Sequence, residues 1–401
     1  MPAPASPASA VLDAVVEKLT DDLVDLRRDL HAHPELSWAE HRTTERVAGL
    51  LEGAGWRVER LPGSGVVADL GPEPGAGGTG RVALRADLDA LPVDDLTGDP
   101  WASTVTGVAH ACGHDVHTAA LVGAGLALAE LAAGHQLPGA VRLLFQPAEE
   151  VMPGGALQLL DRGALDDVDR VFGLHCDPSL DVGQVGLREG PLTGAADQLE
   201  IRLHGPGGHT SRPHLTADLT YALGKLVTEL PSILSRRLDP RAGASVVWGA
   251  VQAGSAHNVI PSRGRLAGTV RMLDAVAWAD AEALVSALVH QVVAPYGVEA
   301  EVRYQRGVPP VVNEHTSTQL LARAVESVLG EEGHVATQQS LGGEDFGWFL
   351  DRVPGAMGRL GTRTPGGPTY DLHQGNLRVD DRATTIGARV LAGAALASLG
   401  A

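Results

Sequence analysis

The pattern of apolar and polar residues divides the first half of the chain into alternating helices and strands. Over residues 12–51 apolar residues recur at helical spacing, with a break at the sequence HAHPEL, where Pro34 interrupts the pattern. Residues 81–86 form a short apolar run of strand type, and residues 115–133 form a helix rich in Ala and Leu. The sequences AVRLLFQ and VDRVFGL are further buried strands. Strands that alternate with long helices predict an α/β fold with a mainly parallel sheet.

The pattern changes near Gly190. Over residues 195–306 the segments read strand, helix, strand, strand, helix, strand, which is the order of a ferredoxin-like α+β unit. The α/β pattern then resumes, with helices predicted at 317–329 and 381–399. The simplest architecture is therefore a catalytic domain interrupted by a smaller inserted domain. The predicted divisions are a disordered tail at 1–10, a catalytic domain at 11–190 and 309–401, and an inserted domain at 191–308.

Length and charge restrict the classes of partner. A chain of 401 residues exceeds the size at which single cores stop growing, which favours two domains. The formal net charge of −18 argues against nucleic acid and anionic membranes as partners. We find neither a signal peptide nor an apolar run near the roughly 18 residues of a membrane helix. The two cysteines, Cys112 and Cys176, fit a reducing cytoplasm, and a disulfide between them is the alternative.

Polar side chains follow the carboxyl ends of three predicted strands. They are Asp87 and Asp89, then Glu149 and Glu150, and then His175. In open α/β sheets this edge is where ligands bind. Cys112 and His114 lie in a loop before a helix and can face the same edge. Because carboxylates, imidazoles and a thiolate are ligands of zinc-like metals, this combination predicts a metal site.

The sequence CGHDVH leaves two ligand sets open. Cys112 and His114 can converge from an irregular loop because Gly113 permits the backbone to bend, and Asp115 is a candidate N-cap for the following helix. His114 and His117 share a helical face, so a Cys-His-His set is one alternative. The other alternative is that His117 is a hydrogen-bonded packing residue of the helix, which we favour.

A thiol nucleophile is the rival role for Cys112. The neighbouring histidines offer a base, but Asp87, Asp89 and Asp115 would raise the pKa of the thiol unless a cation is present. The acidic surroundings therefore favour metal ligation over nucleophilic catalysis.

The two carboxylates of QPAEE can divide two roles. Adjacent side chains of an extended segment point in opposite directions, so one carboxylate can bind metal while the other acts as general base on a bound water. A solvated acidic loop is the alternative. His175 is a candidate ligand, with Asp177 or a backbone carbonyl behind its ring, and His373 is a weaker candidate. Glu344 and Asp345 lie at a predicted helix start, where capping alone would explain them.

Eight motifs appear in an order that resembles a known enzyme family. They are RADLDALPV, HACGHDVHTAAL, FQPAEE, GLHCDP, GPGGHTSRPH, NVIP, GGEDF and LHQ. In this order they are similar to the aminoacylase / hippurate hydrolase family of dinuclear metallohydrolases. That group includes auxin-amino-acid conjugate hydrolases, and carboxypeptidases and deacetylases are more distant relatives. The resemblance extends from about residue 22 to 399.

The resemblance implies a role for each motif residue of the catalytic domain. The implied metal ligands are Cys112, His114, Glu150, His175 and His373. Glu149 would be the general acid/base, and Asp89 would complete the catalytic pair by orienting a ligand. Asp115 and Asp345 would lie behind the ligands. More distant relatives have a metal-binding histidine near the position of Asp87, so Asp87 stays unassigned.

The resemblance also implies that the inserted domain is a dimerisation or lid domain. In relatives the histidine of the GGH motif reaches the partner's active site, which points to His209 in this chain. Asn258 of NVIP and Arg271 of GTVR match positions that bind substrate or the developing oxyanion. The sequence after His373, QGNLRVDD, lacks the proline and aromatic residue of many relatives. Since that loop borders the substrate pocket, substrate specificity does not transfer from those relatives.

Together these expectations describe a cytoplasmic, homodimeric, metal-dependent amidohydrolase. It would cleave N-acyl-L-amino acids into a carboxylic acid and an amino acid. Two divalent ions per subunit, Zn or Mn with Co or Ni as alternatives, would lower the pKa of a shared water, and Glu149 would carry the proton. The alternatives are a dipeptidase or carboxypeptidase, a deacetylase of a small metabolite, and a catalytically silent binding protein.

Overall fold

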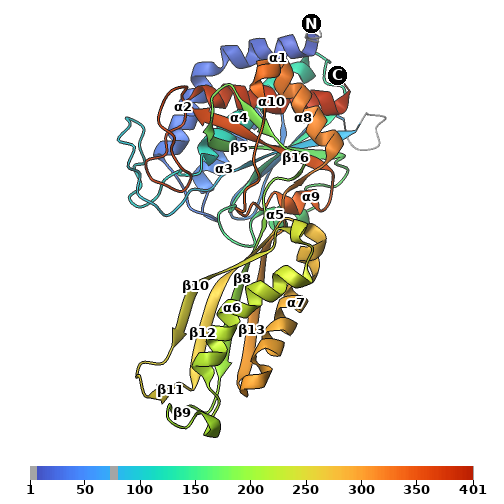
Figure 1. Ribbon diagram of the computed structural model, residues 1–401. Helices are drawn as coiled ribbons and strands as arrows, with labels where there is room; N and C mark the ends of the chain where they lie inside the picture. Colours follow the sequence, from blue (N-terminus) through green and yellow to red (C-terminus); the bar gives the residue numbers. More distant parts are fainter. Residues whose placement is uncertain (1–6, 73–79, 401) are drawn as a thin grey trace. The chain divides into compact units, whose positions relative to one another are not determined.

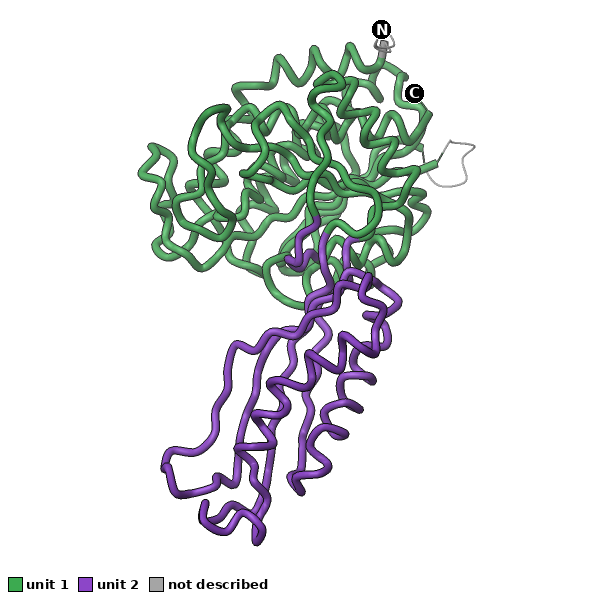
Figure 2. Tube along the Cα trace, in the orientation of Figure 1, with its two compact units in different colours: residues 1–192, 312–338, 345–401 green, residues 193–311, 339–344 purple. Residues whose placement is uncertain are grey.

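The computed structural model describes residues 7–72 and 80–400, which form parts of two compact units (Figure 2). Unit 1 comprises residues 1–192, 312–338 and 345–401, and unit 2 comprises 193–311 and 339–344. The sequence analysis assigns 339–344 to the catalytic domain instead. This short segment belongs to unit 2, and the Arg271 guanidinium donates a hydrogen bond to its Leu341 carbonyl, at 2.8 Å.

Unit 1 is built on a mixed sheet whose central strands are parallel. The order of its strands is β1-β2-β4-β3-β5-β16-β6-β15. The four central strands, β4, β3, β5 and β16, run parallel to one another, which agrees with the predicted α/β class. The strands are β1 (Arg57–Arg60), β2 (Val66–Leu70), β3 (Arg81–Asp87), β4 (Ala140–Gln146), β5 (Arg170–Asp181), β6 (Val185–Leu187), β15 (His334–Ala336) and β16 (Gly355–Arg363). A separate antiparallel pair joins β7 (Gly190–Pro191) to β14 (Val312–Asn313).

Helices cover this sheet and complete the core of unit 1 (Figure 1). They are α1 (Pro7–Lys18), α2 (Thr20–Ala32), α3 (His41–Gly53), α4 (His114–Ala133), α5 (Ala156–Asp161), α8 (His315–Leu329), α9 (Gly347–Leu350) and α10 (Arg382–Leu399), with a 3₁₀ turn at Glu331–Gly333. The predicted tail at 1–10 is wrong for residues 7–10, which belong to α1, where Leu12 and Val16 are buried in the core. Residues 1–6 lie outside the described residues.

Two helices are long and apolar enough, by composition alone, to cross a membrane. In the part of the chain that the structure describes, they are α4 and the segment Ala275–Tyr296, and a buried core helix meets the same criterion of length and composition. Most of α4 is buried inside unit 1 against α1, α2, α10 and β3. Its apolar composition is therefore that of a core helix, surrounded on all sides by other elements.

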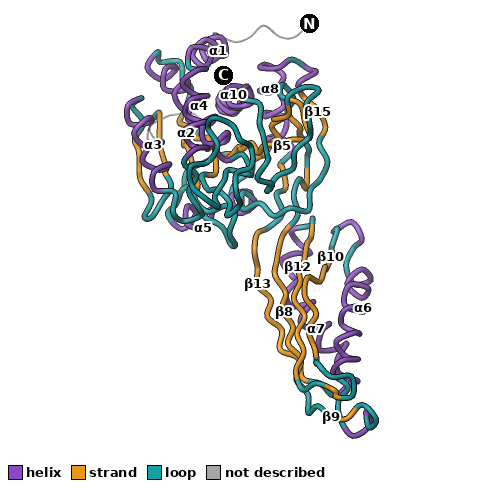
Figure 3. The backbone as a smooth tube through the Cα atoms, turned by 90° about the vertical axis from the view of Figure 1, so that its left-hand side faces the viewer, coloured by secondary structure: helices purple, strands orange, loops and turns teal. Residues whose placement is uncertain are grey.

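Unit 2 has the element order of a ferredoxin-like fold. Its sheet order β10-β12-β8-β13 is antiparallel throughout, and the two long helices pack on one face of it (Figure 1 and Figure 3). Two short strands, β9 and β11, form a separate pair. The elements are β8 (Ala195–His204), β9 (Gly208–His209), α6 (Leu219–Arg237), β10 (Ser245–Ala253), β11 (Val259–Ile260), β12 (Arg263–Met272), α7 (Ala275–Val293) and β13 (Glu299–Val308), with 3₁₀ turns at Pro213–Leu215, Pro240–Ala242 and Ala294–Tyr296.

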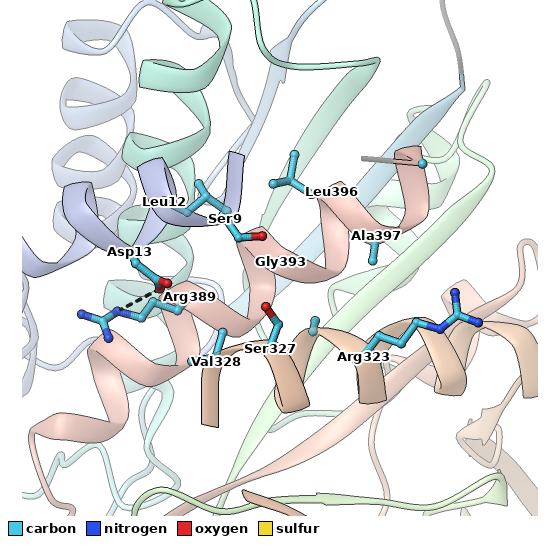
Figure 4. A pocket seen from close by; sticks show the side chains of 12 residues that line it. Ser9, Leu12, Asp13, Arg323, Ser327, Val328, Arg389, Gly393, Leu396 and Ala397 are labelled. Carbon is cyan, nitrogen blue, oxygen red and sulfur yellow. Dashed lines mark ion pairs between the residues drawn. The ribbon is translucent and has the colours of Figure 1, made fainter. Parts of the chain in front are cut away.

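A cavity of about 400 Å³ lies among α1, α8 and α10 of unit 1 (Figure 4). The close-up shows the Arg389 guanidinium directed at Asp13, with an N–O distance of 3.7 Å, and Ser9 and Ser327 on the cavity wall. The residues that line it include none of the predicted ligands. The candidate chemistry therefore lies elsewhere in the unit.

Candidate metal centre

The loop that carries Cys112 and His114 is shaped by Gly113. Gly113 has a φ of +86°, and a Cβ at this position would lie 2.8 Å from the Sγ of Cys176. Glycine is required here both by the left-handed backbone and by the close approach of Cys176. Helix α4 begins at His114, directly after this bend, so the predicted N-cap role of Asp115 is wrong.

The predicted ligands converge into three overlapping groups. In each group the ligand atoms lie within 4.8 Å of one another. The groups are Cys112 with His114 and His175, Cys112 with Glu150 and His373, and His114 with Glu149 and Glu150. All five predicted ligands and Glu149 are thus brought together from distant parts of unit 1. Because Cys112 belongs to two of the groups, the arrangement can hold two adjacent ions.

Individual distances describe how the groups meet. His114 Nε2 lies 3.7 Å from Glu150 Oε1, and His373 Nε2 lies 3.4 Å from the same oxygen. On the other side of its ring, His114 Nδ1 lies 3.3 Å from Asp89 Oδ1. The Cys112 Sγ is 3.5 Å from His175 Nε2. His373 approaches from an exposed loop whose backbone N–H bonds to the Ala111 carbonyl at 2.7 Å.

Several of these buried polar atoms have no hydrogen-bond partner among the described residues. They are both ring nitrogens of His114, Oε1 of Glu150 and Oδ1 of Asp89. An unsatisfied polar atom in the interior is costly, whereas a divalent cation would use the lone pairs of the imidazole and the carboxylate. The residues present therefore fit a metal site.

His175 is prepared to bind through one defined nitrogen. Its Nδ1 lies 2.8 Å from the carbonyl of Cys176, so this nitrogen carries the proton and donates it. Burial, reinforced by the positive charge of Arg359, holds the pKa of His175 well below its usual range. The ring is therefore neutral, and the lone pair of Nε2 faces Cys112, as a metal-binding histidine requires.

The potential at the site is strongly negative. Although burial acts in the opposite direction, the charges of Asp87, Asp89 and Glu150 raise the pKa of His114 to about 10. Burial and the charges of Glu150 and Glu149 hold the pKa of Cys112 well above its usual range. A nucleophilic cysteine needs a lowered pKa, so this environment disfavours the nucleophile alternative and favours a bound cation.

The alternatives for His117 and Asp87 are decided by their hydrogen bonds. His117 Nδ1 lies 2.6 Å from Asp87 Oδ1, and its Nε2 accepts the backbone N–H of Cys176 at 2.8 Å. Both nitrogens are occupied, so His117 is a packing residue of α4. The other oxygen of Asp87 accepts from Arg85 at 2.6 Å. Asp87 is therefore engaged behind the site.

Asp89 supports both the His114 side and the Glu150 side of the site. Its Oδ2 accepts the backbone N–H of Glu150 at 2.9 Å and the hydroxyl of Ser37 at 2.6 Å, while Oδ1 faces His114. The other two predicted supporting residues lie farther back. Asp115 is hydrogen-bonded to His31 at 2.9 Å and forms an ion pair with Arg27, with an N–O distance of 2.8 Å.

Arg85 is a buried residue that the sequence analysis did not single out. Its guanidinium bonds to Asp87, to Gln146 at 2.9 Å and to Asp345 at 2.8 Å. Asp345 thus supports the site through Arg85. A lone arginine inside the apolar strand VALRAD is the sequence signal that could have identified it, because a buried guanidinium needs acidic partners.

The three predicted residues of unit 2, His209, Asn258 and Arg271, lie at two separate positions in the unit. His209 and Asn258 are neighbours, because β9 pairs with β11 and the Thr210 N–H bonds to the Asn258 carbonyl at 3.2 Å. His209 is exposed, with its Nδ1 held by the hydroxyl of Ser211 at 2.8 Å. Arg271 lies near the other end of β12, eight residues beyond Arg263, or roughly 27 Å along an antiparallel strand.

The family model that matches residues 83–397 is that of peptidase family M20/M25/M40. The chain belongs to this family. The predicted relationship is confirmed, and with it the enzyme class, a metallo-amidohydrolase. The family match covers parts of both units and all five candidate ligands.

Relatives of known sequence include bacterial proteins with several activities. A putative glutamate–cysteine ligase 2-3 of Rhodococcus jostii is 49% identical over 92% of this chain, which spans 46% of that longer protein. The probable hydrolase sll0100 of Synechocystis is 40% identical, over 96% of this chain and 97% of its own. An N-acetylcysteine deacetylase of Bacillus subtilis is 36% identical, over 92% and 95%.

A solved relative also has a metal site. The YXEP protein of Bacillus subtilis, a dinuclear metal binding peptidase from the M20 family, is 34% identical with a TM-score of 0.82. The alignment covers 96% of this chain and 99% of that one. The three overlapping ligand groups of this chain are consistent with dinuclear metal binding as well.

Proposed function

We propose that the protein hydrolyses the amide bond of N-acyl-L-amino acids, releasing a carboxylic acid and a free amino acid. The convergence of the five candidate ligands beside Glu149 is the observation that carries this proposal. The named activity of the N-acetylcysteine deacetylase, an amide hydrolysis on an acylated amino acid, supports it. Because other relatives are named deacetylases and carboxypeptidases, deacetylation of a small metabolite and peptide cleavage are the alternative outcomes of the test below.

Cys112, His114, Glu150, His175 and His373 would hold two divalent ions. A thiolate among imidazoles and carboxylates suits Zn, and Mn is the second choice because oxygen ligands are also present, with Co and Ni as alternatives. When bound, such ions polarise the amide carbonyl and lower the pKa of water. The charge of Asp89 lies 3.3 Å from Nδ1 of His114, and the Cys176 carbonyl orients His175 by accepting a hydrogen bond from its Nδ1.

Glu149 would act as the proton carrier. It lies one residue before the ligand Glu150 and within 4.8 Å of the ligand atoms of both Glu150 and His114. A carboxylate in this position can accept the proton of the attacking water at one oxygen and deliver it to the leaving nitrogen. Both transfers use the same side chain, so Glu149 is restored after each turnover.

We further propose that the enzyme is a homodimer joined through unit 2 and that it acts in the cytoplasm. Strand β10 is an edge of its sheet, and Val247 and Val251 on it are 61% and 53% exposed. An apolar edge strand is a ready partner for a second copy. The two cysteines are free thiols, which supports a reducing compartment. His209 would then reach the partner's site and stabilise the developing oxyanion with Asn258.

A substrate panel tests the proposal. Metal-loaded protein is assayed on N-acetyl, N-benzoyl and longer N-acyl amino acids beside dipeptides, with zinc, manganese or cobalt added. We expect hydrolysis of at least one N-acyl amino acid at a higher kcat/KM than any dipeptide, abolished by chelator and restored by metal. Faster cleavage of dipeptides would assign a dipeptidase instead. Uniform inactivity of metal-loaded protein would favour a binding role.

A further inference from the structure

Glu40 lies beneath the turn that carries the two catalytic-site glutamates. It directly precedes helix α3 and has no exposed surface. Its Oε1 accepts the backbone N–H of Ala148 at 2.7 Å, and its Oε2 accepts the hydroxyl of Ser64 at 2.6 Å. A buried carboxylate is thus committed to a backbone group one residue before Glu149. A contact across 108 positions of sequence is a tertiary feature of the site.

Ala148 adopts a backbone conformation that alanine rarely takes. Its φ is +54°, in the left-handed region where a Cβ crowds the following carbonyl. Its N–H bonds to Glu40, and its carbonyl accepts the N–H of Gly155 at 3.0 Å. These two bonds fix the peptide groups on both sides of the Ala148 α-carbon. The conformation of Ala148 sets the direction in which the next side chain, Glu149, leaves the chain.

Glu40 can be separated experimentally from the metal ligands. The second carboxylate that holds the same turn, Asp89, faces His114 and bonds to the N–H of Glu150, so a change there would disturb both the turn and the ligands. The side chain of Glu40 is hydrogen-bonded to the backbone N–H of Ala148 and to the hydroxyl of Ser64. A substitution at Glu40 therefore acts on the turn itself.

We propose that Glu40 is a positioning residue, whose carboxylate holds Ala148 in the left-handed conformation and thereby aims Glu149 at the reacting groups. This inference rests on the proposed function, since it takes Glu149 as the proton carrier. It adds that the orientation of the Glu149 side chain depends on Glu40, which directly precedes α3. Without the Glu40 bond, the intrinsic preference of alanine against the left-handed conformation remains. This preference lowers the population of that conformation roughly tenfold.

The test is a rescue experiment in the metal-loaded enzyme. Glu40→Ala is expected to lower kcat about tenfold or more with KM and metal content nearly unchanged, because the correct turn becomes a minor conformer. Glu40→Gln, which keeps an oxygen acceptor for the Ala148 N–H, is expected to stay within about threefold of wild type. Ala148→Gly alone should be nearly neutral. Combined with Glu40→Ala, it should restore most of kcat, since glycine adopts positive φ without penalty.

Each outcome decides the proposal. Failure of Ala148→Gly to restore kcat would mean that Glu40 serves general stability only, and the proposal would be wrong. If Glu40→Ala does not fold, Glu40→Asp replaces it, because it keeps the carboxylate but is one methylene too short to reach the Ala148 N–H. We expect the same loss of kcat in Glu40→Asp and the same recovery when Ala148→Gly is added. Hydrogen exchange at the Ala148 amide is a readout without substrate: faster exchange in Glu40→Ala is expected, and unchanged exchange contradicts the proposal. This readout stands even if the proposed substrate class is wrong.

Discussion

In unit 1 the five predicted ligands and Glu149 come from four separate stretches of chain and form three overlapping groups, in which His114 and Cys112 are both buried. In unit 2 the predicted residues remain apart: His209 and Asn258 are neighbours at one end, and Arg271 lies near the other end of β12. The cluster in unit 1 contains buried nitrogens without a hydrogen-bond partner among the described residues, and its side chains fit a metal ion. His209 of unit 2 is exposed, and its ring is oriented by Ser211. The fold alone brings the predicted residues of unit 1 together, whereas within unit 2 it leaves His209 exposed and far from Arg271.

The largest expected effect is at Glu149 of unit 1. Glu149→Gln should keep metal content and fold but lower kcat by about 10²- to 10⁴-fold, because the amide cannot accept the proton of water. Metal analysis and steady-state kinetics on the same preparation measure this. Glu17→Gln on the exposed face of α1 is the matched control and should behave as wild type. Near-normal turnover in Glu149→Gln would remove Glu149 from the mechanism.

The next effect sharpens the contrast with unit 2. His209→Ala should lower kcat/KM by about 10²-fold with unchanged metal content, as expected for loss of an oxyanion donor. When His209→Ala and Glu149→Gln proteins are unfolded together and refolded, mixed dimers would contain one intact site. Activity should then recover to about a quarter of wild type, since half the dimers are mixed and one of two sites is complete. Absence of recovery would show that His209 acts within its own chain or not at all.

The smallest expected effect is on stability, at Glu314, which is not one of the predicted site residues of either unit. Glu314 caps α8 by accepting the N–H groups of Thr316 and Ser317, and it pairs with Arg170 at 2.9 Å. Although partial burial acts in the opposite direction, the hydrogen bonds from Thr316 and Ser317 lower the pKa of Glu314 to about 2. Glu314→Gln should lower the free energy of unfolding by about 1 kcal/mol at neutral pH without changing activity.

The pH dependence of that loss follows from the lowered pKa. The ionised carboxylate stabilises the fold fully above its unfolded pKa of about 4.3, and this contribution disappears as pH falls toward the folded value. Urea unfolding of both proteins should therefore differ by a constant amount from pH 8 to 5 and converge near pH 2. A difference in the free energy of unfolding that persists at pH 2 would contradict the capping role of Glu314. A loss of activity in Glu314→Gln would mean that a change at this distant position of unit 1 alters the candidate metal site.

The elements and the ligands could be predicted because they depend on local signals. Apolar runs marked β3, β4 and β5, and the candidate ligand Glu150 follows β4 in sequence. His175 lies inside β5, which continues to Asp181, so the expectation that the strand ends at His175 is wrong. The supporting contacts could not be predicted in the same way. The bond of Glu40 to Ala148, the left-handed φ of Ala148 and the pairing of Arg85 with Asp345 depend on tertiary packing between distant segments. The start of α4 at His114 depended on the conformation of Gly113, which permits several turns.

Cobalt titration measures whether Cys112 belongs to a two-ion site. Metal-free protein is titrated with Co²⁺ while its near-ultraviolet and visible absorption is recorded, beside Cys112→Ser as the matched variant. We expect two ions per chain and a sulfur-to-cobalt charge-transfer band that is absent in Cys112→Ser, which should also bind cobalt more weakly. Fewer than two ions in the wild-type protein, or a band that persists without the thiol of Cys112, would contradict this assignment of Cys112.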